Sequence, residues 1–272
     1  MNKIILTDNE IRKEINDDLD VNIKEIDNLS EVKKIIIKPL KDTKLEISYK
    51  TSCFKADIEI DIDENINFDL FELREDEHIK VKYNYNVLEN STLNITKFYD
   101  CKKVKEIDTI NLNGVGATSN FTLKTISTDY QSYNLIINHN NKNTISNVVN
   151  SGVNLTGSID FNVEGIVPSG SVDSELNQNN RIITFNDSKC KIDPKLLIEE
   201  NDVVANHSAL IGKFEDEELF YLMSRGIDYN SAVTLLVKGF LLDNLKDERL
   251  NDIIEKYWRW YIEPWWFFNA KK

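Results

Sequence analysis

The sequence predicts a β-rich body followed by a small helical part, and three observations support this division. Between about residues 33 and 167, short runs alternate apolar and polar side chains, which is typical of half-buried strands. No helical pattern separates these runs, so the crossover helices of an α/β fold are not expected. From Asp216 onward, apolar residues recur every three or four positions, as on one face of an α-helix.

The strands of the body are expected in two groups. The polar first 30 or so residues predict no amphipathic helix, because their isoleucines are too sparse. Longer runs then predict strands at 33–40, 44–49, 56–62, 80–87 and 92–98. Shorter runs between Asn, Ser, Thr and Gly turns predict strands at 109–112, 120–126, 133–137, 144–149 and 153–163. The spacing of these runs is compatible with a sandwich, a barrel or a β-helix.

The helical part shows clear boundaries. Acidic residues 216–218 suit the first turn of a helix, where the helix dipole favours negative charge, and Gly226 suits its left-handed C-terminal cap. Asp228 then caps a second helix with an apolar face. A third helix is expected from residue 246 to about 261, and Pro264 would end it before an aromatic tail. Rings of this tail either pack on the helices or dock a partner.

Composition excludes several classes of protein. The 272 residues, 41% of them hydrophobic and 29% charged, are typical of a soluble globular chain. A net charge of −13 without a basic cluster argues against binding to nucleic acid or to an anionic membrane. We expect a cytoplasmic protein, because no apolar run resembles a secretion signal or a membrane span, and three cysteines without CxxC spacing suggest no disulfide framework.

A family resemblance appears at residues 207–228. The sequence HSALIGKFEDEELFYLMSRGID fits the pattern H-x-A-x-x-G-x-x-x-[DE]-[DE]-E-L-F-Y-L-x-S-R-G-I-[DE] and closely resembles the C-terminal signature of the SufB/SufD family, the scaffold subunits of the Suf iron–sulfur cluster assembly machinery. The resemblance is dense over residues 187–242, weak over the β-rich middle and not visible in the first 80 or so residues.

The resemblance implies a fold and a set of partners. It favours a right-handed parallel β-helix core followed by a small helical domain. The expected parts are a short β-rich N-terminal segment (1–80) leading into the core, a β-helix core (81–212), and a C-terminal helical domain with an aromatic tail (213–272). It also implies a second scaffold subunit, either SufB-type or identical, and a SufC-type ABC ATPase. A transient iron–sulfur cluster shared with the second subunit is the expected cofactor, with flavin as a further candidate.

His207 and Cys190 are the candidate metal ligands. Taken alone, a histidine among apolar residues is more often structural than a ligand, and a lone cysteine is most often a small buried hydrophobe. In SufD-type relatives, however, the histidine at this position lies near the interface with SufB, and imidazole is a suitable ligand for iron. SufB-type relatives carry an earlier cysteine and a glutamate after the histidine, where this chain has Arg181 and Ser208. The chain is therefore more similar to SufD, which puts in doubt any cluster held by this chain alone.

The helical region of the family docks the ATPase. The resemblance therefore makes the charged and half-exposed positions candidates for this contact, namely Glu217, Tyr221, Arg225, Asp228 and Lys238. No GxxxxGK[ST] phosphate loop occurs, so ATP hydrolysis is expected from a partner and the chain itself is expected to be non-catalytic.

Two alternatives remain open. One is a β-helix polysaccharide lyase or glycosidase, because acidic β-helices bind sugars along a groove; it does not explain the helix pair. The other is a non-catalytic β-rich interaction protein. No GxSxG elbow is present to support a serine hydrolase, and acidic pairs are uninformative among 46 Asp and Glu residues.

Overall fold

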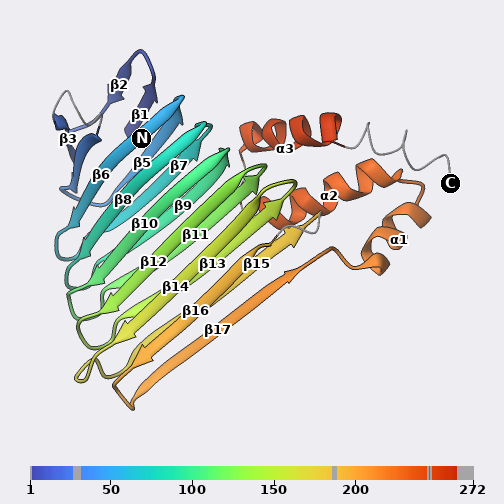
Figure 1. The fold of residues 1–272 in the computed structure, drawn as a ribbon. Coiled ribbons are helices and arrows are strands. Elements are labelled where there is room, and N and C mark those ends of the chain that lie inside the picture. The colour runs from blue at the N-terminus through green and yellow to red at the C-terminus, as the bar shows by residue number, and fades with distance from the viewer. Residues whose placement is uncertain (1, 27–31, 186–188, 244, 246, 262–272) are drawn as a thin grey trace. The chain divides into compact units, whose positions relative to one another are not determined.

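The chain forms a parallel β-solenoid of about seven turns followed by three helices, so the predicted fold class is confirmed (Figure 1). The structure is a computed structural model that describes residues 2–26, 32–185, 189–243, 245 and 247–261. It divides into two compact units, residues 1–211 and 212–272. None of the three helices, as far as they are described, has the length and apolar character that crossing a bilayer requires.

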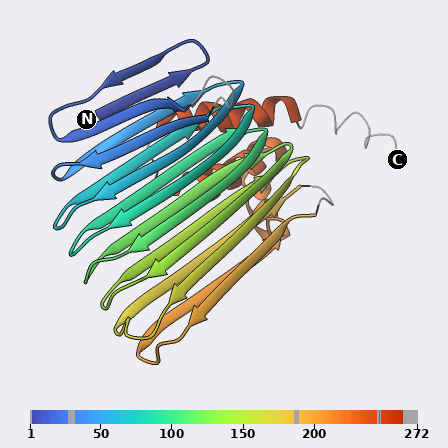
Figure 2. The ribbon, with the colours of Figure 1, turned by 60° about the vertical axis from the view of Figure 1, so that its left-hand side comes forward.

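Each coil of the solenoid contributes one strand to each of two sheets, which lie face to face (Figure 2). The nine-stranded sheet has the order β17 (Val203–Gly212), β15 (Ser174–Thr184), β13 (Ile145–Asn154), β11 (Thr118–Ser127), β9 (Thr92–Cys101), β7 (Asn67–Arg74), β5 (Thr43–Lys50), β1 (Asn2–Thr7) and β2 (Ile11–Glu14). The eight-stranded sheet has the order β16 (Lys191–Ile198), β14 (Ser158–Val167), β12 (Tyr130–His139), β10 (Lys103–Leu112), β8 (His78–Val87), β6 (Cys53–Ile62), β4 (Val32–Pro39) and β3 (Leu19–Ile26).

The same turn recurs between successive coils and explains the Asn-rich turns of the sequence. Between each strand of the eight-stranded sheet and the next strand, from β6 to β15, one residue has a left-handed backbone with φ between 53° and 69°; these residues are Asn65, Asn90, Gly116, Asn143 and Asp173. Gly, Asn and Asp adopt this conformation at the lowest steric cost. The composition of the turns is therefore a structural requirement of the coil.

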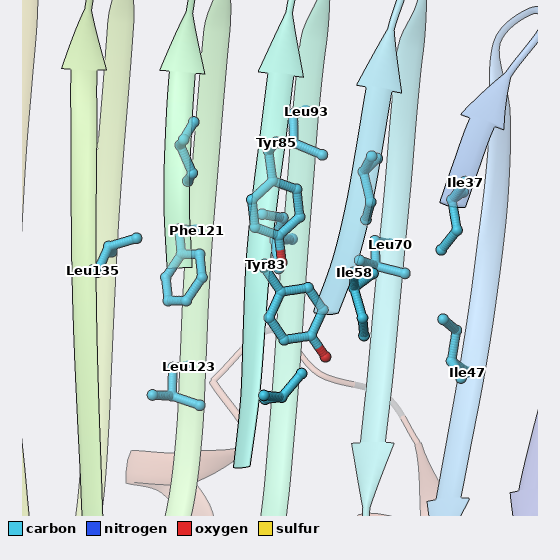
Figure 3. Packing of buried hydrophobic residues seen from close by; sticks show 14 of the residues in the cluster. Ile37, Ile47, Ile58, Leu70, Tyr83, Tyr85, Leu93, Phe121, Leu123 and Leu135 are labelled. Atoms are coloured by element: carbon cyan, nitrogen blue, oxygen red, sulfur yellow. The ribbon is translucent and has the colours of Figure 1, made fainter. Parts of the chain in front are cut away.

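Stacked rows of apolar side chains fill the space between the sheets (Figure 3). Because the strands are parallel and in register, an inward residue lies beside the inward residue of the next coil. One such row runs Leu45, Leu70, Ile95, Phe121 and Val148, all buried. Glycine is required where the filling is tight: a Cβ on Gly152 would lie 2.7 Å from the Ile159 side chain.

A ladder of side-chain amides runs across the outer face of the nine-stranded sheet. Each amide nitrogen donates to the side-chain oxygen of the preceding coil, at 2.8 to 3.2 Å, from Asn206 through Asn177, Asn147, Asn120 and Asn94 to Asp69. These hydrogen bonds stabilise one register between successive coils, because a shift of one residue would break all of them.

The N-terminal strands were not predicted. Strands β1 to β3 lie within the polar first 26 residues, and the pairs β1–β2 and β3–β4 are antiparallel, whereas the later pairs are parallel. The strands of residues 1–80 belong to the same two sheets as those of residues 81–212. The single strand expected at 153–163 was wrong, because a turn at Gly157 divides it between β13 and β14.

The helical unit follows the predicted boundaries closely. Helix α1 (Asp216–Ser224) ends before Gly226, whose φ is 85°, and α2 (Tyr229–Leu241) is capped by Asp228, which accepts a hydrogen bond from the Ser231 N–H. Helix α3 (Glu248–Tyr261) follows. The apolar face of α2 is buried at Ala232, Val233, Val237 and Leu241.

The interior of the solenoid also holds charge. Between the sheets lies a group of buried acidic and basic side chains, Glu72, Arg74, Asp76, Lys97, Glu106 and Asp108, which we call the ionic cluster. Lys97 Nζ lies 2.8 Å from Glu106 Oε1 and 2.6 Å from Asp108 Oδ1. Arg74 lies 3.1 Å from Asp76 and donates to Tyr83 Oη at 2.7 Å. Charges buried this deeply are tolerated only when partners satisfy them.

The two acidic partners of Lys97 differ in their surroundings. Burial raises the pKa of Asp108 well above its ordinary value. Burial also opposes ionisation of Glu106, but the charges of Lys97 and Arg74 and the hydrogen bonds from Asp108 and Lys97 together outweigh burial and lower the pKa of Glu106. Of the two carboxyls, Glu106 therefore favours the ionised form and Asp108 favours the protonated form.

Changes in the ionic cluster should have unequal costs. Lys97→Met should lower the free energy of unfolding by about 3–5 kcal/mol, because it leaves buried carboxylate uncompensated. Asp108→Asn should cost less, about 1 kcal/mol, because burial favours the neutral form of this carboxyl and the amide is also neutral. The control is Lys105→Met on the outer face, with an expected effect within about 0.5 kcal/mol. Urea unfolding measures all three, and equal losses for the two lysine variants would contradict the assignment.

Candidate functional site

The C-terminal end of the solenoid is an open end. Strands β16 and β17 are the last of their sheets, so no further coil covers them. Both strands carry exposed apolar side chains: Leu197, Ile198, Val204, Leu210 and Ile211 are 38 to 55% accessible. Exposed apolar side chains gathered at one end of a molecule mark an interaction site more often than scattered ones do.

His207 lies in the middle of this open end. Its neighbours Asn206 and Ser208 bond to Asn177 and Asn179, so both belong to the outer face of β17. Because side chains alternate along a strand, His207 belongs to the opposite row, the row that the buried Gln178 occupies in the preceding strand. His207 is nevertheless exposed, because β17 has no covering coil. It borders a hollow of about 280 Å³ formed with the ends of the amide ladder.

Cys190 lies at the same end but in the other sheet. It immediately precedes β16, is half-buried and packs with Ile192 against the core. Because β16 and β17 belong to different sheets, Cys190 and His207 are not neighbours along one hydrogen-bonded ladder. Among the other cysteines, Cys53 is exposed and Cys101 is buried. Within the described part of the chain, no three His, Cys, Asp or Glu side chains converge as a metal site would require.

The remaining histidines are distinguishable from His207 by their surroundings. His139 is buried, with Nδ1 2.7 Å from Thr144 Oγ1 and Nε2 2.9 Å from Ser146 Oγ. Burial lowers the pKa of His139 to about 4, so the ring is neutral at physiological pH. Both ring nitrogens are engaged, which makes His139 a structural residue. His78 is exposed at the start of β8.

The structure separates the five candidate partner-binding residues into two groups. Glu217, Tyr221 and Arg225 are exposed on or beside α1, and the Arg225 guanidinium lies 5.2 Å from the centre of the Tyr221 ring. Asp228 serves as the cap of α2, and its bonds to Ser231 lower its pKa. Lys238 forms an ion pair of 2.6 Å with Glu255 of α3. These last two residues therefore have roles inside the helical unit.

Helix α1 is more exposed than its sequence predicts. The helical spacing of Leu219, Phe220 and Leu222 is typical of a face that packs in a core, but no residue of α1 is buried within the described structure. Phe220 is 74% accessible and Met223 is 46% accessible, beside the exposed Tyr221. A helical period identifies an apolar face and cannot say whether the face meets its own chain or another one. This exposed face was the main feature that sequence reasoning missed.

Comparison with known proteins links most of this chain to one family. The family model for the SUF system FeS cluster assembly SufBD core domain matches residues 39–240. Among curated relatives, the iron–sulfur cluster assembly protein SufD of Bacillus subtilis is 29% identical over 150 residues, which are 54% of this chain and 32% of the relative.

Two further relatives match shorter stretches. An iron–sulfur cluster assembly SufBD family protein of Pyrococcus horikoshii is 29% identical over 110 residues, covering 38% of this chain and 25% of the relative. SufD of Escherichia coli is 35% identical over 75 residues, covering 26% of this chain and 18% of the relative. The chain thus spans about a third or less of the length of these relatives. Because the family model covers the solenoid from β5 onward and the first two helices, this chain belongs to the SufB/SufD family of iron–sulfur cluster assembly proteins.

Proposed function

We propose that this chain is a non-catalytic scaffold subunit on which an iron–sulfur cluster is assembled. It pairs through strand β17 with a second scaffold chain, either SufB-type or identical, and binds a SufC-type ABC ATPase on its helical unit. The observation that carries the proposal is an unprotected sheet edge with an exposed histidine at its centre.

The edges of the solenoid differ in their protection against pairing. Proteins commonly protect an exposed edge strand with charged residues or proline. Strand β2, at one edge of the nine-stranded sheet, reads IRKE and is exposed throughout, and the edge strand β16 contains Pro194 and two lysines. Strand β17, at the other edge of the nine-stranded sheet, reads VVANHSALIG over ten residues and contains no proline, lysine, arginine or carboxylate. Its free backbone groups and exposed apolar side chains therefore favour the addition of a further strand.

Pairing at this edge also suits the side chains on either side of His207. The amide ladder ends at Asn206, whose nitrogen donates backward to Asn177. An antiparallel strand from a second copy, centred on His207, would bring Asn206 opposite Ser208 of the other copy and the two histidines face to face. A SufB-type chain would instead supply its own ligands opposite His207.

The cluster, as the product under assembly, then forms at the seam between the two chains. His207 would supply an imidazole and Cys190 a thiolate from the other sheet, and both donor types suit iron. Since the described residues of one chain bring together no set of three such ligands, the second chain completes the set. ATP-driven movement of the bound ATPases would shift the population between closed and open seams and so release the cluster.

The helical unit is the proposed docking site for the ATPase. Its exposed apolar face on α1, formed by Phe220, Tyr221 and Met223, is flanked by the charged residues Glu217 and Arg225. Aromatic residues, methionine and arginine are enriched in protein interfaces, and aromatic anchors carry much of their binding energy. The chain has no phosphate-binding loop of its own, which is consistent with hydrolysis by a partner.

His207→Ala should leave folding intact and reduce the amount of cluster formed by the reconstituted complex at least tenfold, because losing even an outer-shell partner of a metal ligand typically costs about 10- to 100-fold. The measurement is absorbance of the cluster after addition of iron and sulfide, with thermal unfolding as a check on folding. His78→Ala, on the same solenoid and equally exposed, is the matched control. Normal cluster yield from the His207 variant would remove this residue from the proposed role.

Val204→Lys combined with Leu210→Lys should abolish pairing of the scaffold chains, because lysine on an edge strand opposes strand addition. The mass of the complex, measured by light scattering after gel filtration, reports pairing with a SufB-type chain or with a second copy. Ile11→Lys, at the opposite edge of the same sheet, should leave the mass unchanged. Loss of pairing in the Ile11 variant, together with normal pairing in the β17 variant, would show that the chains pair through β2 and not through β17.

Phe220→Asp should weaken binding of the SufC-type ATPase by about 30-fold or more, since truncation of a buried interface aromatic typically costs 2 kcal/mol or more. Titration calorimetry with the purified ATPase measures this affinity. The control is Leu197→Asp, an exposed apolar residue in the solenoid, for which less than about a twofold change is expected. Unchanged affinity of the Phe220 variant would exclude the α1 face.

A further inference from the structure

A strip of lysines on the outer face of the eight-stranded sheet has no role in the function proposed above. The lysine strip consists of Lys80 and Lys82 on β8 and Lys103 and Lys105 on β10, all exposed. Lys80 and Lys105 are partners in the register of these adjacent parallel strands. Adjacent strands lie about 4.8 Å apart, so these two lysine side chains leave the sheet from neighbouring positions.

This arrangement is unfavourable for the isolated chain. Like charges directly opposite each other on neighbouring strands are destabilising. Other outward lysines of this sheet are neutralised by carboxylates, as Lys34 is by Glu59 at 3.4 Å and Lys38 is by Asp63 at 2.9 Å. Among the described residues, by contrast, Lys80, Lys82 and Lys105 form no ion pair, and Lys103 lies 3.7 Å from Asp129.

The strip stands out against the charge of the whole chain. The formal net charge is −13, yet these four lysines gather on two neighbouring strands, with His78 beside Lys103 in the same register. At physiological ionic strength the screening length is about 8 Å, so a ligand at the strip experiences mainly the local positive charge. The strip is therefore an electropositive site on an acidic protein.

A shallow hollow adjoins the strip and adds an apolar element. It has a volume of about 340 Å³, and its lining includes Lys82, Ile107 and Thr109 as well as Asp57 and the ion pair of Lys34 and Glu59. Ile107 is an outward, half-buried side chain two residues after Lys105 on the same strand. The surface therefore combines a row of ammonium groups with one neighbouring apolar contact.

We propose that the lysine strip docks an acidic segment of a partner protein, with carboxylates on the lysines and an apolar side chain in the adjoining hollow. The positive charge of the lysine strip indicates an anionic ligand. Two observations favour carboxylates over the phosphates of a nucleic-acid backbone. The strip contains no arginine, the side chain best suited to bidentate phosphate binding, and the backbone N–H groups of β8 and β10 are used within the sheet.

The test uses the full chain and a fluorescein-labelled peptide of about ten glutamates, with fluorescence anisotropy as the readout. We expect binding that weakens between about 50 and 300 mM salt. Lys80→Glu with Lys105→Glu should weaken it about tenfold or more, because two attractive contacts become repulsive. Lys50→Glu with Lys142→Glu, which changes the net charge equally at exposed sites elsewhere, should weaken it less than about twofold.

Three results would overturn the proposal. They are no measurable binding of the peptide by the unaltered chain, equal weakening in the two double variants, and tighter binding of an oligothymidylate of similar charge than of the peptide. Thermal unfolding establishes that each variant is folded, and Lys80→Gln with Lys105→Gln replaces the charge reversal if that variant is unstable. The strip variant should form cluster normally in the scaffold complex, which separates this surface from the open end.

Discussion

The hydrogen-bonded register between successive coils is the constraint on which the rest of the structure depends. In a solenoid each coil contacts only its neighbours, so the fold is stable only while each inward row continues from one coil to the next. Two features stabilise this register: the apolar rows between the sheets, and the amide ladder from Asp69 to Asn206 on the outer face. A coil may lengthen, from the 25 residues between Asp61 and Asn86 to the 30 between Asn150 and Asn180, because the turns absorb the extra residues.

The same constraint produces the functional end. A stack of coils must stop, and its last coil exposes both backbone groups and core-facing side chains unless something covers them. At the N-terminal end the antiparallel pairs β1–β2 and β3–β4 interrupt the parallel stack, and the charged β2 protects one edge. At the C-terminal end β17 continues the parallel register up to a bare edge, and His207 lies there in a row that is otherwise buried. Its exposure is thus a consequence of its being on the final coil.

Much of this structure follows from the sequence, and the exceptions have physical causes. Period-two runs predicted most strands of the solenoid, and Gly226 and Asp228 predicted the helix boundaries, because both signals depend on local backbone geometry. The N-terminal strands were missed because β2 and β3 carry charged side chains on edges that face solvent. The ionic cluster was missed because charged residues in alternating strands are expected to face outward, whereas Lys97 and Glu106 neutralise each other inside.

The candidate site was predictable only in part. The sequence signature drew attention to His207, but only the arrangement of the sheets shows that Cys190 belongs to the opposite layer. Likewise, the apolar stripe of α1 was visible in the sequence, but its exposure depends on tertiary packing, since α1 has no buried residue in the described structure. An apolar helix face that binds another chain has the same residue pattern as one that packs within its own chain.

Hydrogen–deuterium exchange of the β17 amides, measured for the isolated chain and after addition of a second scaffold chain, tests the central claim most directly. Some backbone N–H groups of β17 (Val203–Gly212) point away from β15 and have no neighbouring strand. If the open edge receives a strand from the second chain, these N–H groups should exchange rapidly in the isolated chain and at least tenfold more slowly in the complex. Exchange in β2 should stay unchanged. Unchanged exchange in β17 within a complex of proven mass, or protection confined to β2, would contradict it.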